Sequence, residues 1–166
     1  MKTAKYLVLL LGLFVLAQCK SKQPVFQDQP LLQNAEVYVQ DWVGGQPGSA
    51  GTNITIEIDN PAEIAPDTMY YHQRIVPVEV RETNGKTLWM GRFITLTRRE
   101  PDPNEDPNTD VSVKVPECEN FPFDLKDDEI VLRYRDKKGS YYYKWETVKK
   151  KKSIYYPTTK PKPQMD

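Results

Sequence analysis

The sequence predicts an all-β fold, arranged as an antiparallel sandwich of two sheets with seven or eight strands. Three observations lead to this prediction. Short segments alternate polar residues with β-branched or aromatic ones, which is the pattern of half-buried strands. Turn residues recur at regular spacing, with 14 prolines and 8 glycines among the 166 residues. After the first apolar run, no stretch keeps the period of an amphipathic helix. A small β-barrel is the alternative arrangement of the same strands.

Each expected strand is bounded by turn residues. The Asn84-Gly85 pair predicts a type I′ hairpin turn, because both central positions of that turn need a positive φ. A second hairpin turn is expected between Asp136 and Gly139. Pro77 has no backbone N–H, so it must lie on an edge strand or at a bulge. The expected strands cover residues 36–42, 53–59, 74–82, 87–97, 111–115, 130–135, 141–148 and, at an edge, 153–156.

The expected core takes apolar residues from one face of each strand. A domain of this size buries roughly two-thirds of the surface of its unfolded chain, so disulfides are dispensable. The chain does not carry the Cys…Trp…Cys signature of antibody domains, so "Ig-like" describes the architecture alone. The expected core residues are Val37, Val39, Ile54, Ile56, Ile58, Val76, Val78, Val80, Leu88, Met90, Ile94, Leu96, Ile130 and Leu132.

The N-terminus carries the features of an export signal. Lys2 and Lys5 precede an apolar run at residues 6–17, which is shorter than the roughly 20 residues that a membrane-spanning helix needs. Cys19 follows this run directly. The segment resembles the signal and lipobox of bacterial lipoproteins, in which lipid is attached to the cysteine and the chain is cut before it. The resemblance implies a signal peptide at residues 1–18 and a lipid-modified Cys19.

The rest of the chain divides into three expected parts. Residues 19–34 are mostly polar and include two prolines, and we expect a flexible tether there. Residues 35–156 hold all the expected strands and form the sandwich domain. Residues 157–166 are rich in proline and lysine, which predicts a disordered tail.

Trp42 and the glycines after it add a second resemblance. The stretch at residues 41–53 resembles a pattern in small Bacteroidota lipoproteins that carry Ig-like or sandwich domains. This implies a location in the cell envelope, with the membrane as a partner through the lipid on Cys19. Lipoproteins of Bacteroidota that are exported to the surface tend to be acidic just after the cysteine, whereas Lys20 and Lys22 make this segment basic. The resemblance therefore favours the periplasmic side over the cell surface. An envelope location also excludes nucleic acid as a partner.

The sequence does not assemble a catalytic set. His72 is the single histidine, and no Gly-x-Ser-x-Gly motif is present. Cys118 lies between Glu117 and Glu119, whose negative charges disfavour its thiolate. We therefore expect no enzymatic activity, no cofactor and no metal centre. Residues 102–110 place oxygen-bearing side chains at every second position, so calcium binding stays an alternative to a solvated acidic loop.

Charge is distributed unevenly along a chain whose formal net charge is +0. Residues 100–130 hold eleven acidic side chains against two basic ones, whereas residues 131–166 hold eleven basic against three acidic. This predicts either mutual screening within the fold or two faces of opposite sign.

Three groups of residues are candidates for binding. The first is Trp42 with the glycine-rich loop after it, which is either a hairpin connection or an anion-binding nest of backbone N–H groups. The second is one face of a late strand, which is a stacking platform for sugars if it points outward and core if it points inward. The third is a run of four lysines after the last long strand, either a plain solvated run or a contact for an acidic partner. The residues are Gly44, Gly45 and Gly48 in the loop, Tyr141, Tyr143 and Trp145 on the strand, and Lys149, Lys150, Lys151 and Lys152.

These features predict a lipid-anchored envelope protein whose sandwich domain binds a partner or serves as a structural element, without catalysis. The expected partners are an envelope protein, a glycan or an anionic surface. The alternative is a carbohydrate-binding module of a glycan-handling system. In addition, Thr68 lies in an Asp-Thr-Met triplet that resembles the O-glycosylation site of Bacteroidota proteins.

Overall fold

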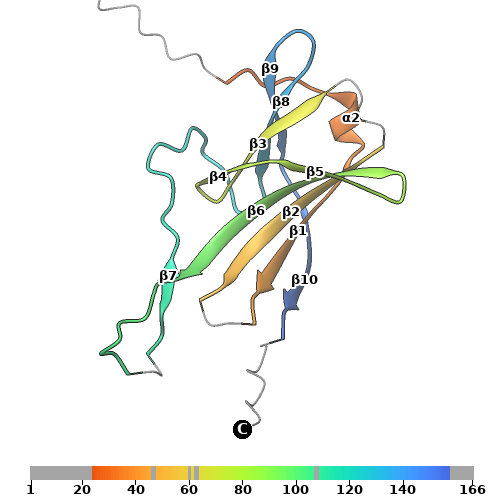
Figure 1. Cartoon of the computed structure of the whole chain (residues 1–166). Coiled ribbons are helices and arrows are strands. Elements are labelled where there is room, and N and C mark those ends of the chain that lie inside the picture. The colour runs from red at the N-terminus through yellow and green to blue at the C-terminus, as the bar shows by residue number, and fades with distance from the viewer. Residues whose placement is uncertain (1–23, 46–47, 60, 62–63, 107–108, 158–166) are drawn as a thin grey trace, which may run out of the picture.

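The computed structural model describes residues 24–45, 48–59, 61, 64–106 and 109–157. In this part of the chain, ten strands form two sheets that pack against each other (Figure 1). The prediction of an all-β sandwich is therefore confirmed, with ten strands in the described residues in place of the seven or eight expected. Both sheets are open, so the barrel alternative is wrong. Cys19 and the tail after Pro157 lie outside the described residues.

The larger sheet has six strands and the smaller has four. The larger sheet contains β1 (Glu36–Val43), β2 (Ala50–Ile58), β5 (Glu79–Thr83), β6 (Lys86–Arg98), β7 (Ser112–Lys114) and β10 (Lys149–Tyr155). Its order is β10-β1-β2-β6-β5, and β7 pairs with β6. The smaller sheet contains β3 (Ala65–Tyr71), β4 (Arg74–Pro77), β8 (Ile130–Arg135) and β9 (Ser140–Trp145), in the order β4-β3-β8-β9. Neighbouring strands are antiparallel, except that β1 and β10 are parallel.

The predicted strand at residues 74–82 is two strands in two different sheets. β4 ends at Pro77 on the edge of the smaller sheet, and β5 begins at Glu79 in the larger one. The edge position expected for Pro77 is confirmed. Proline cannot donate to a sheet, and the next amide, that of Val78, donates to the carbonyl oxygen of Asp67 at 3.1 Å before the chain crosses over.

β3 is a strand that the alternation rule did not predict. It begins with a proline in its second position, and its last four residues, Thr68 to Tyr71, are all buried. These four residues do not alternate between polar and apolar, because segment 115–129 covers the second face of the smaller sheet. Phe121 and Phe123 of that segment pack edge-on against Tyr70, with ring centres 6.1 and 4.9 Å away.

The hairpin turn at Asn84-Gly85 is confirmed. Asn84 has φ 52° and Gly85 has φ 75°, and the flanking Thr83 and Lys86 pair across β5 and β6. The turn from β3 to β4 has the same backbone form without any glycine, since His72 has φ 43° and Gln73 has φ 55°. The predicted turn at residues 136–139 also forms, where the amide of Asp136 donates to the carbonyl oxygen of Gly139 at 3.0 Å.

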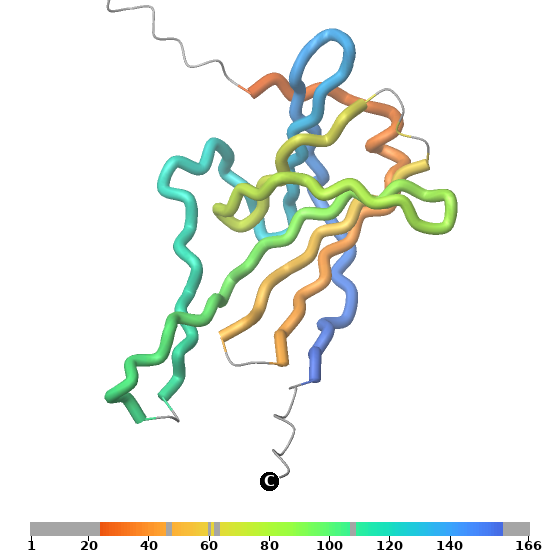
Figure 2. Tube along the Cα trace, viewed as in Figure 1, coloured from red at the N-terminus to blue at the C-terminus, as the bar shows by residue number. Residues whose placement is uncertain are grey.

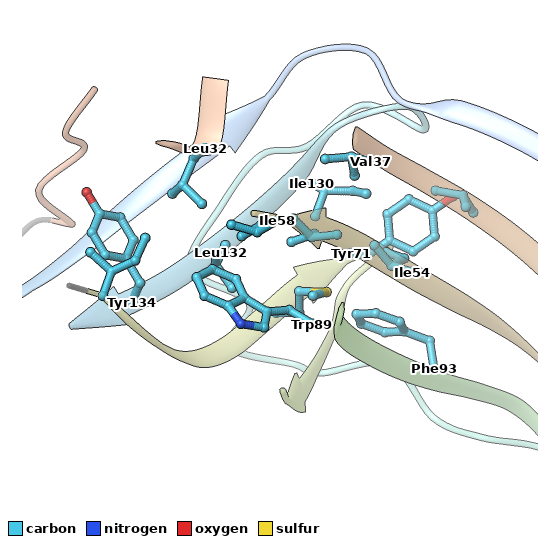
Figure 3. Packing of buried hydrophobic residues seen from close by; sticks show 14 residues of the cluster. Leu32, Val37, Ile54, Ile58, Tyr71, Trp89, Phe93, Ile130, Leu132 and Tyr134 are labelled. Atoms are coloured by element: carbon cyan, nitrogen blue, oxygen red, sulfur yellow. The ribbon is translucent and has the colours of Figure 1, made fainter. Parts of the chain in front are cut away.

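The core fills the space between the two sheets (Figure 3). The predicted core residues of β1, β2 and β8 are buried, but the face assigned to β6 is wrong. Trp89 and Phe93 point inward at 0% and 1% exposure, whereas Ile94 is 49% exposed. β6 carries apolar residues on both faces, and its register with β2 decides between them, because buried Ile56 lies opposite Trp89. Val80 is also exposed rather than buried.

Residues 24–34, expected to belong to a flexible tether, are packed on the domain. Phe26 forms a parallel bridge with Tyr142 of β9, and the amide of Gln27 donates to the Tyr142 carbonyl oxygen at 3.0 Å. The short helix α2 (Pro30–Gln33) then places Leu32 in the core, fully buried. In Figure 2 this orange segment passes beside the blue hairpin of β8 and β9. The segment covers an edge of the smaller sheet that would otherwise be open.

Candidate functional site

The face of the larger sheet that points away from the smaller sheet is the candidate functional site, and we call it the outer face. In β1 the buried residues Val37 and Val39 alternate with Glu36, Tyr38, Gln40 and Trp42, which therefore lie on the outer face. The pairing of β1 with β2 runs without interruption from Glu36 to Val43, so the alternation continues to Trp42.

The first row across the outer face is apolar. Trp42 pairs with Ile154 of β10 on one side and with Gly51 of β2 on the other, and Gly51 pairs with Ile94 of β6. The Trp42 indole lies over Gly51. A Cβ atom at Gly51 would lie 2.8 Å from Cζ2 and 2.9 Å from Cε2 of the indole, so only glycine leaves this space. The indole stays partly exposed.

The second row, one step along the strands, is polar throughout. Gln40 pairs with Lys151 of β10 and with Asn53 of β2, and Asn53 pairs with Arg92 of β6. The Gln40 amide nitrogen donates to the carbonyl oxygen of Lys152 at 2.9 Å, which fixes the orientation of this side chain. Amide groups thus occupy the middle of the row, with a cation at each end.

The third row carries an aromatic ring under a cation. Tyr38 pairs with Lys149 of β10 and with Thr55 of β2. The ammonium nitrogen of Lys151 lies 3.1 Å from the centre of the Tyr38 ring. This cation–π contact holds the Lys151 side chain over β1 rather than in free solution.

Positive charge exceeds negative charge on the outer face. Its carboxylates are each engaged by a cation: Glu36 by Lys149 at 4.0 Å, Glu57 by Lys86, and Glu79 by both Arg81 at 3.1 Å and Arg92 at 3.3 Å. Lys151 contacts a ring instead of a carboxylate. The side of the face near β10 is therefore electropositive.

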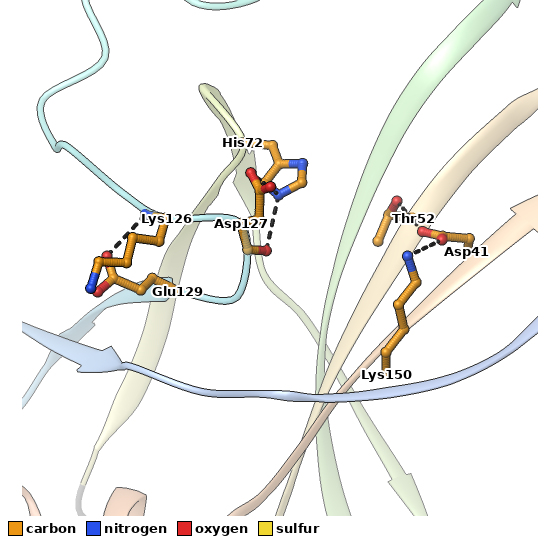
Figure 4. A network of polar contacts seen from close by, with 7 residues as sticks. All are labelled: Asp41, Thr52, His72, Lys126, Asp127, Glu129 and Lys150. Atoms are coloured by element: carbon orange, nitrogen blue, oxygen red, sulfur yellow. Dashed lines mark hydrogen bonds and ion pairs between the residues drawn. The ribbon is translucent and has the colours of Figure 1, made fainter.

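The inner side of the same strand pair is held by an ion pair (Figure 4). Asp41 accepts a hydrogen bond from Lys150 at 2.8 Å and another from the Thr52 hydroxyl at 2.8 Å. Burial raises the pKa of Asp41, but these two hydrogen bonds and the Lys150 charge outweigh it and leave the pKa below its usual value. The contact fastens β10 to β1.

The four lysines lie in a different element from the one expected. They were expected between the strand at residues 141–148 and the edge strand at residues 153–156, but Lys149, Lys150, Lys151 and Lys152 form the first part of the edge strand β10. All four are exposed. β10 ends the order of the larger sheet, and charged side chains on such an edge strand oppose pairing with further strands.

The glycine-rich loop after Trp42 closes a hairpin. The amide of Gly44 donates to the carbonyl oxygen of Ser49 at 2.6 Å, and a Cβ atom at Gly44 would lie 2.7 Å from the Ser49 hydroxyl. Gly48 has φ +80° and is buried against Ser112 of β7. Gly45 is half-buried, and residues 46–47 lie outside the described part. These contacts use the glycines for close packing and do not support an anion nest.

The face formed by Tyr141, Tyr143 and Trp145 points inward. All three side chains are partly buried and pack against the core, and the rings of Tyr143 and Trp145 meet edge-on at 4.7 Å. The inward alternative therefore applies, and these residues offer no open stacking platform. Thr68 is likewise a poor site for modification, because it is 9% exposed and its hydroxyl accepts a hydrogen bond from Arg133 at 2.9 Å.

A cleft of about 440 Å³ lies between the β3–β4 turn and segment 117–127. His72 lines it, stacks on Tyr71 at 3.9 Å and places Nε2 3.0 Å from the carbonyl oxygen of Asp127 (Figure 4). The amide of Cys118 donates to the carbonyl oxygen of Gln73 at 2.8 Å. Burial and the nearby charges of Asp41, Asp127 and Asp128 raise the pKa of Tyr71 to about 12. His72 is thus held by a stacking contact and a hydrogen bond at the edge of this cleft.

The carboxylates of the acidic loop at residues 102–110 make hydrogen bonds and an ion pair with residues of the loop itself or directly beside it. The Asp102 carboxylate accepts hydrogen bonds from the backbone and side chain of Asn104, and Asp110 accepts one from the amide of Ser112. Glu105 pairs with Arg99 at 2.7 Å. Across the described ranges, no group of three or more His, Cys, Asp or Glu side chains is placed to hold a metal ion.

Trp42, Lys149 and Lys151 are predicted from the sequence as binding residues, but their neighbours on the outer face are not. Tyr38 and Gln40 alternate with buried valines, so the pattern of β1 alone identifies them as outward-facing. Asn53 and Arg92 join the site through cross-strand register, for which the sequence carries no local signal.

No helix in the described part of the chain is both long and apolar enough to cross a membrane. In comparisons with known proteins, no family model matches the chain, and no curated protein and no solved structure shows significant similarity to it.

Proposed function

We propose that this chain is a lipid-anchored protein of the cell envelope, facing the periplasm, whose β-sandwich domain binds a partner through its outer face and performs no catalysis. One observation carries the binding part of the proposal. Trp42, Gln40, Asn53 and the cations Lys151 and Arg92 lie in adjacent rows on one solvent-facing surface of a rigid sheet. Such a surface joins an apolar contact, amide groups and positive charge.

The proposed anchor is the lipid on Cys19, which the apolar run before it supports. Pro24 is the first described residue, and Phe26 is already bridged to Tyr142. Five residue steps from Cys19 to Pro24 reach at most about 18 Å. The domain would therefore lie close to the bilayer, and not at the end of a long tether as the sequence suggested.

Metabolic labelling tests the anchor. A fatty-acid analogue should label the wild-type chain, and Cys19→Ser should remove the label. Equal labelling of both would contradict the lipid attachment.

Co-sedimentation tests the binding surface. The full mature chain, made with Cys19→Ala so that it carries no lipid, is mixed with isolated cell-wall and membrane fractions. We expect retention that falls in Trp42→Ala and in the double variant Lys151→Gln/Arg92→Gln. The double variant Lys137→Gln/Lys138→Gln removes the same charge from the turn between β8 and β9 and serves as the control. If all variants are retained as strongly as the parent chain, the binding surface lies outside the outer face.

A second candidate function is carbohydrate binding, because an indole held against a sheet beside amide side chains is suited to a sugar. The aromatic face first considered for this role, on β9, points into the core. Trp42 on the outer face takes its place as the residue that supports this candidate.

A further inference from the structure

We infer that the outer face binds a glycan chain that carries carboxylate groups, with Trp42 under a sugar ring and Lys151 and Arg92 on the carboxylates. The inference rests on the proposed function, because it takes the outer face as the binding surface. It adds the chemical class of the ligand and a role for each row of side chains.

The apolar contact comes from Trp42. The indole occupies the space above Gly51 that a side chain would otherwise fill, so the sheet itself supports the ring from below. The indole is partly exposed, and Ile154 and Ile94 complete an apolar row on either side of it. Sugar rings present C–H faces to such amphipathic aromatic groups, while their hydroxyls stay solvated or hydrogen-bonded at the edges.

The hydrogen-bonding groups lie one step along the same strands. Gln40 is two residues from Trp42 on β1, a distance of about 7 Å, and Asn53 is its direct partner on β2. An amide offers both donors and an acceptor, which matches hydroxyl groups that also do both. The Gln40 nitrogen is occupied by the carbonyl oxygen of Lys152, so the Gln40 oxygen is oriented away from that bond.

The charges select for carboxylates. Lys151 and Arg92 end the polar row, separated by three strand spacings, or about 14 Å. Lys151 rests on Tyr38, where its ammonium is held without a carboxylate. Arg92 shares Glu79 with Arg81, so this group keeps a positive charge in excess. Carboxylates on a glycan would form charge-assisted hydrogen bonds with Lys151 and Arg92, whereas a neutral glycan would not balance their positive charge.

The shape of the site favours a chain over a single sugar. Trp42 and Tyr38 lie four residues apart on β1, about 13 Å, and both they and Gln40 between them are partly exposed. Acidic peptides and anionic membranes also match the charge. The indole lying against the sheet beside amide side chains favours a sugar over both, and the experiment below includes both as competing outcomes.

Titration calorimetry with the full mature Cys19→Ala chain tests the inference. The probes are oligogalacturonate, its methyl ester as the same sugar without charge, vesicles of phosphatidylglycerol, and poly-glutamate as an acidic peptide. We expect oligogalacturonate to bind, and its methyl ester to bind about tenfold more weakly or not at all. Trp42→Ala and Lys151→Gln/Arg92→Gln should each weaken oligogalacturonate binding by about tenfold. Lys137→Gln/Lys138→Gln should stay within about twofold of the parent chain.

The double variant changes two exposed side chains, so the test remains valid even if Trp42→Ala unfolds, which circular dichroism would reveal. Three results would overturn the inference: no binding of oligogalacturonate, equal binding of its methyl ester, or tighter binding of vesicles or poly-glutamate that does not need Trp42. If envelope fractions still retain the chain through the outer face, such a result refutes the ligand class and leaves the proposed function standing. Loss of retention as well would refute both.

Discussion

Lys151 and Lys150 hold β10 to β1 from opposite faces of the sheet. The Lys151 ammonium lies 3.1 Å from the centre of the Tyr38 ring on the outer face, and the Lys150 ammonium lies 2.8 Å from the Asp41 carboxylate on the inner face. Consecutive residues of a strand point to opposite sides, so adjacent lysines can make both contacts. A run of like charges thus contributes to the docking of the last strand.

The first prediction concerns this docking. A double-mutant cycle of Tyr38→Leu and Lys151→Gln should give a coupling of about 0.5–1 kcal/mol in the free energy of unfolding, as expected for an exposed cation–π pair. Urea unfolding measures it. Repeating the cycle with Lys152→Gln, whose ammonium makes no ion pair among the described residues, should give a coupling near zero. Equal couplings would show that the Lys151 contact does not contribute to stability.

The second prediction concerns the segment that was expected to be a tether. Leu32 is 0% exposed, so Leu32→Ala should lower the free energy of unfolding by about 2–4 kcal/mol through lost burial and the cavity left behind. Val25→Ala in the same segment changes a side chain that is 58% exposed and should cost far less. Chemical unfolding of both variants and the wild type measures these differences in the free energy of unfolding. A Leu32→Ala variant as stable as the wild type would mean that α2 is not docked in solution.

The third prediction concerns the turn at Gly85. Its φ of +75° disfavours a β-branched residue, although no atom lies within 4 Å of the position that a Cβ would take. Gly85→Val should therefore destabilise the domain by about 1–3 kcal/mol through backbone strain alone. Thermal unfolding measures the effect. Gly139→Ala, where the nearest atom would lie at an ordinary 3.6 Å, is the matched control and should change the midpoint much less.

The fourth prediction concerns alkaline pH. The pKa of Tyr71 is raised to about 12 in the folded protein, above its unfolded value of about 10. Between these two values the folded state binds more protons than the unfolded state, so stability falls as pH rises. The wild type should lose about 2 kcal/mol from this residue between pH 10 and 12, and Tyr71→Phe should not lose this part. Urea unfolding at several pH values compares the two chains, and parallel pH profiles would contradict the assignment.

The fifth prediction concerns the whole lysine run. Changing Lys149 to Lys152 to glutamine should weaken retention on anionic envelope fractions and flatten its dependence on salt, because each exposed lysine near an anionic surface contributes about 1 kcal/mol that salt screens. The domain should remain folded, since exposed ion pairs contribute little. Sedimentation at increasing salt measures retention. A salt dependence that survives the substitution would assign the attraction to other cations.

The sequence by itself determined the class of the fold and its local geometry. Alternation at residues 36–42 and 53–59 identified two strands of the larger sheet and the inward face of each. The Asn84-Gly85 pair specified a turn that needs positive φ at two positions, and Pro77 specified an edge position. These features depend on backbone sterics and on neighbours a few residues away, and such information is present in any short window of sequence.

The tertiary structure decided those features of the fold that depend on contacts between residues far apart in the sequence. β6 carries apolar residues on both faces, and only its register with β2 turns Trp89 inward and Ile94 outward. The sheet change after Pro77 depends on Asp67, whose carbonyl oxygen accepts the Val78 amide.

The candidate site depends most on such distant pairing. Gln40 and Lys152 are 112 residues apart in the chain and bonded in the structure, because β10 adds to β1 as a parallel strand. The sequence singled out Trp42 and the lysines separately. It could not place them on one surface, because a pairing between strands so far apart is set by the burial of the whole core and not by any local pattern.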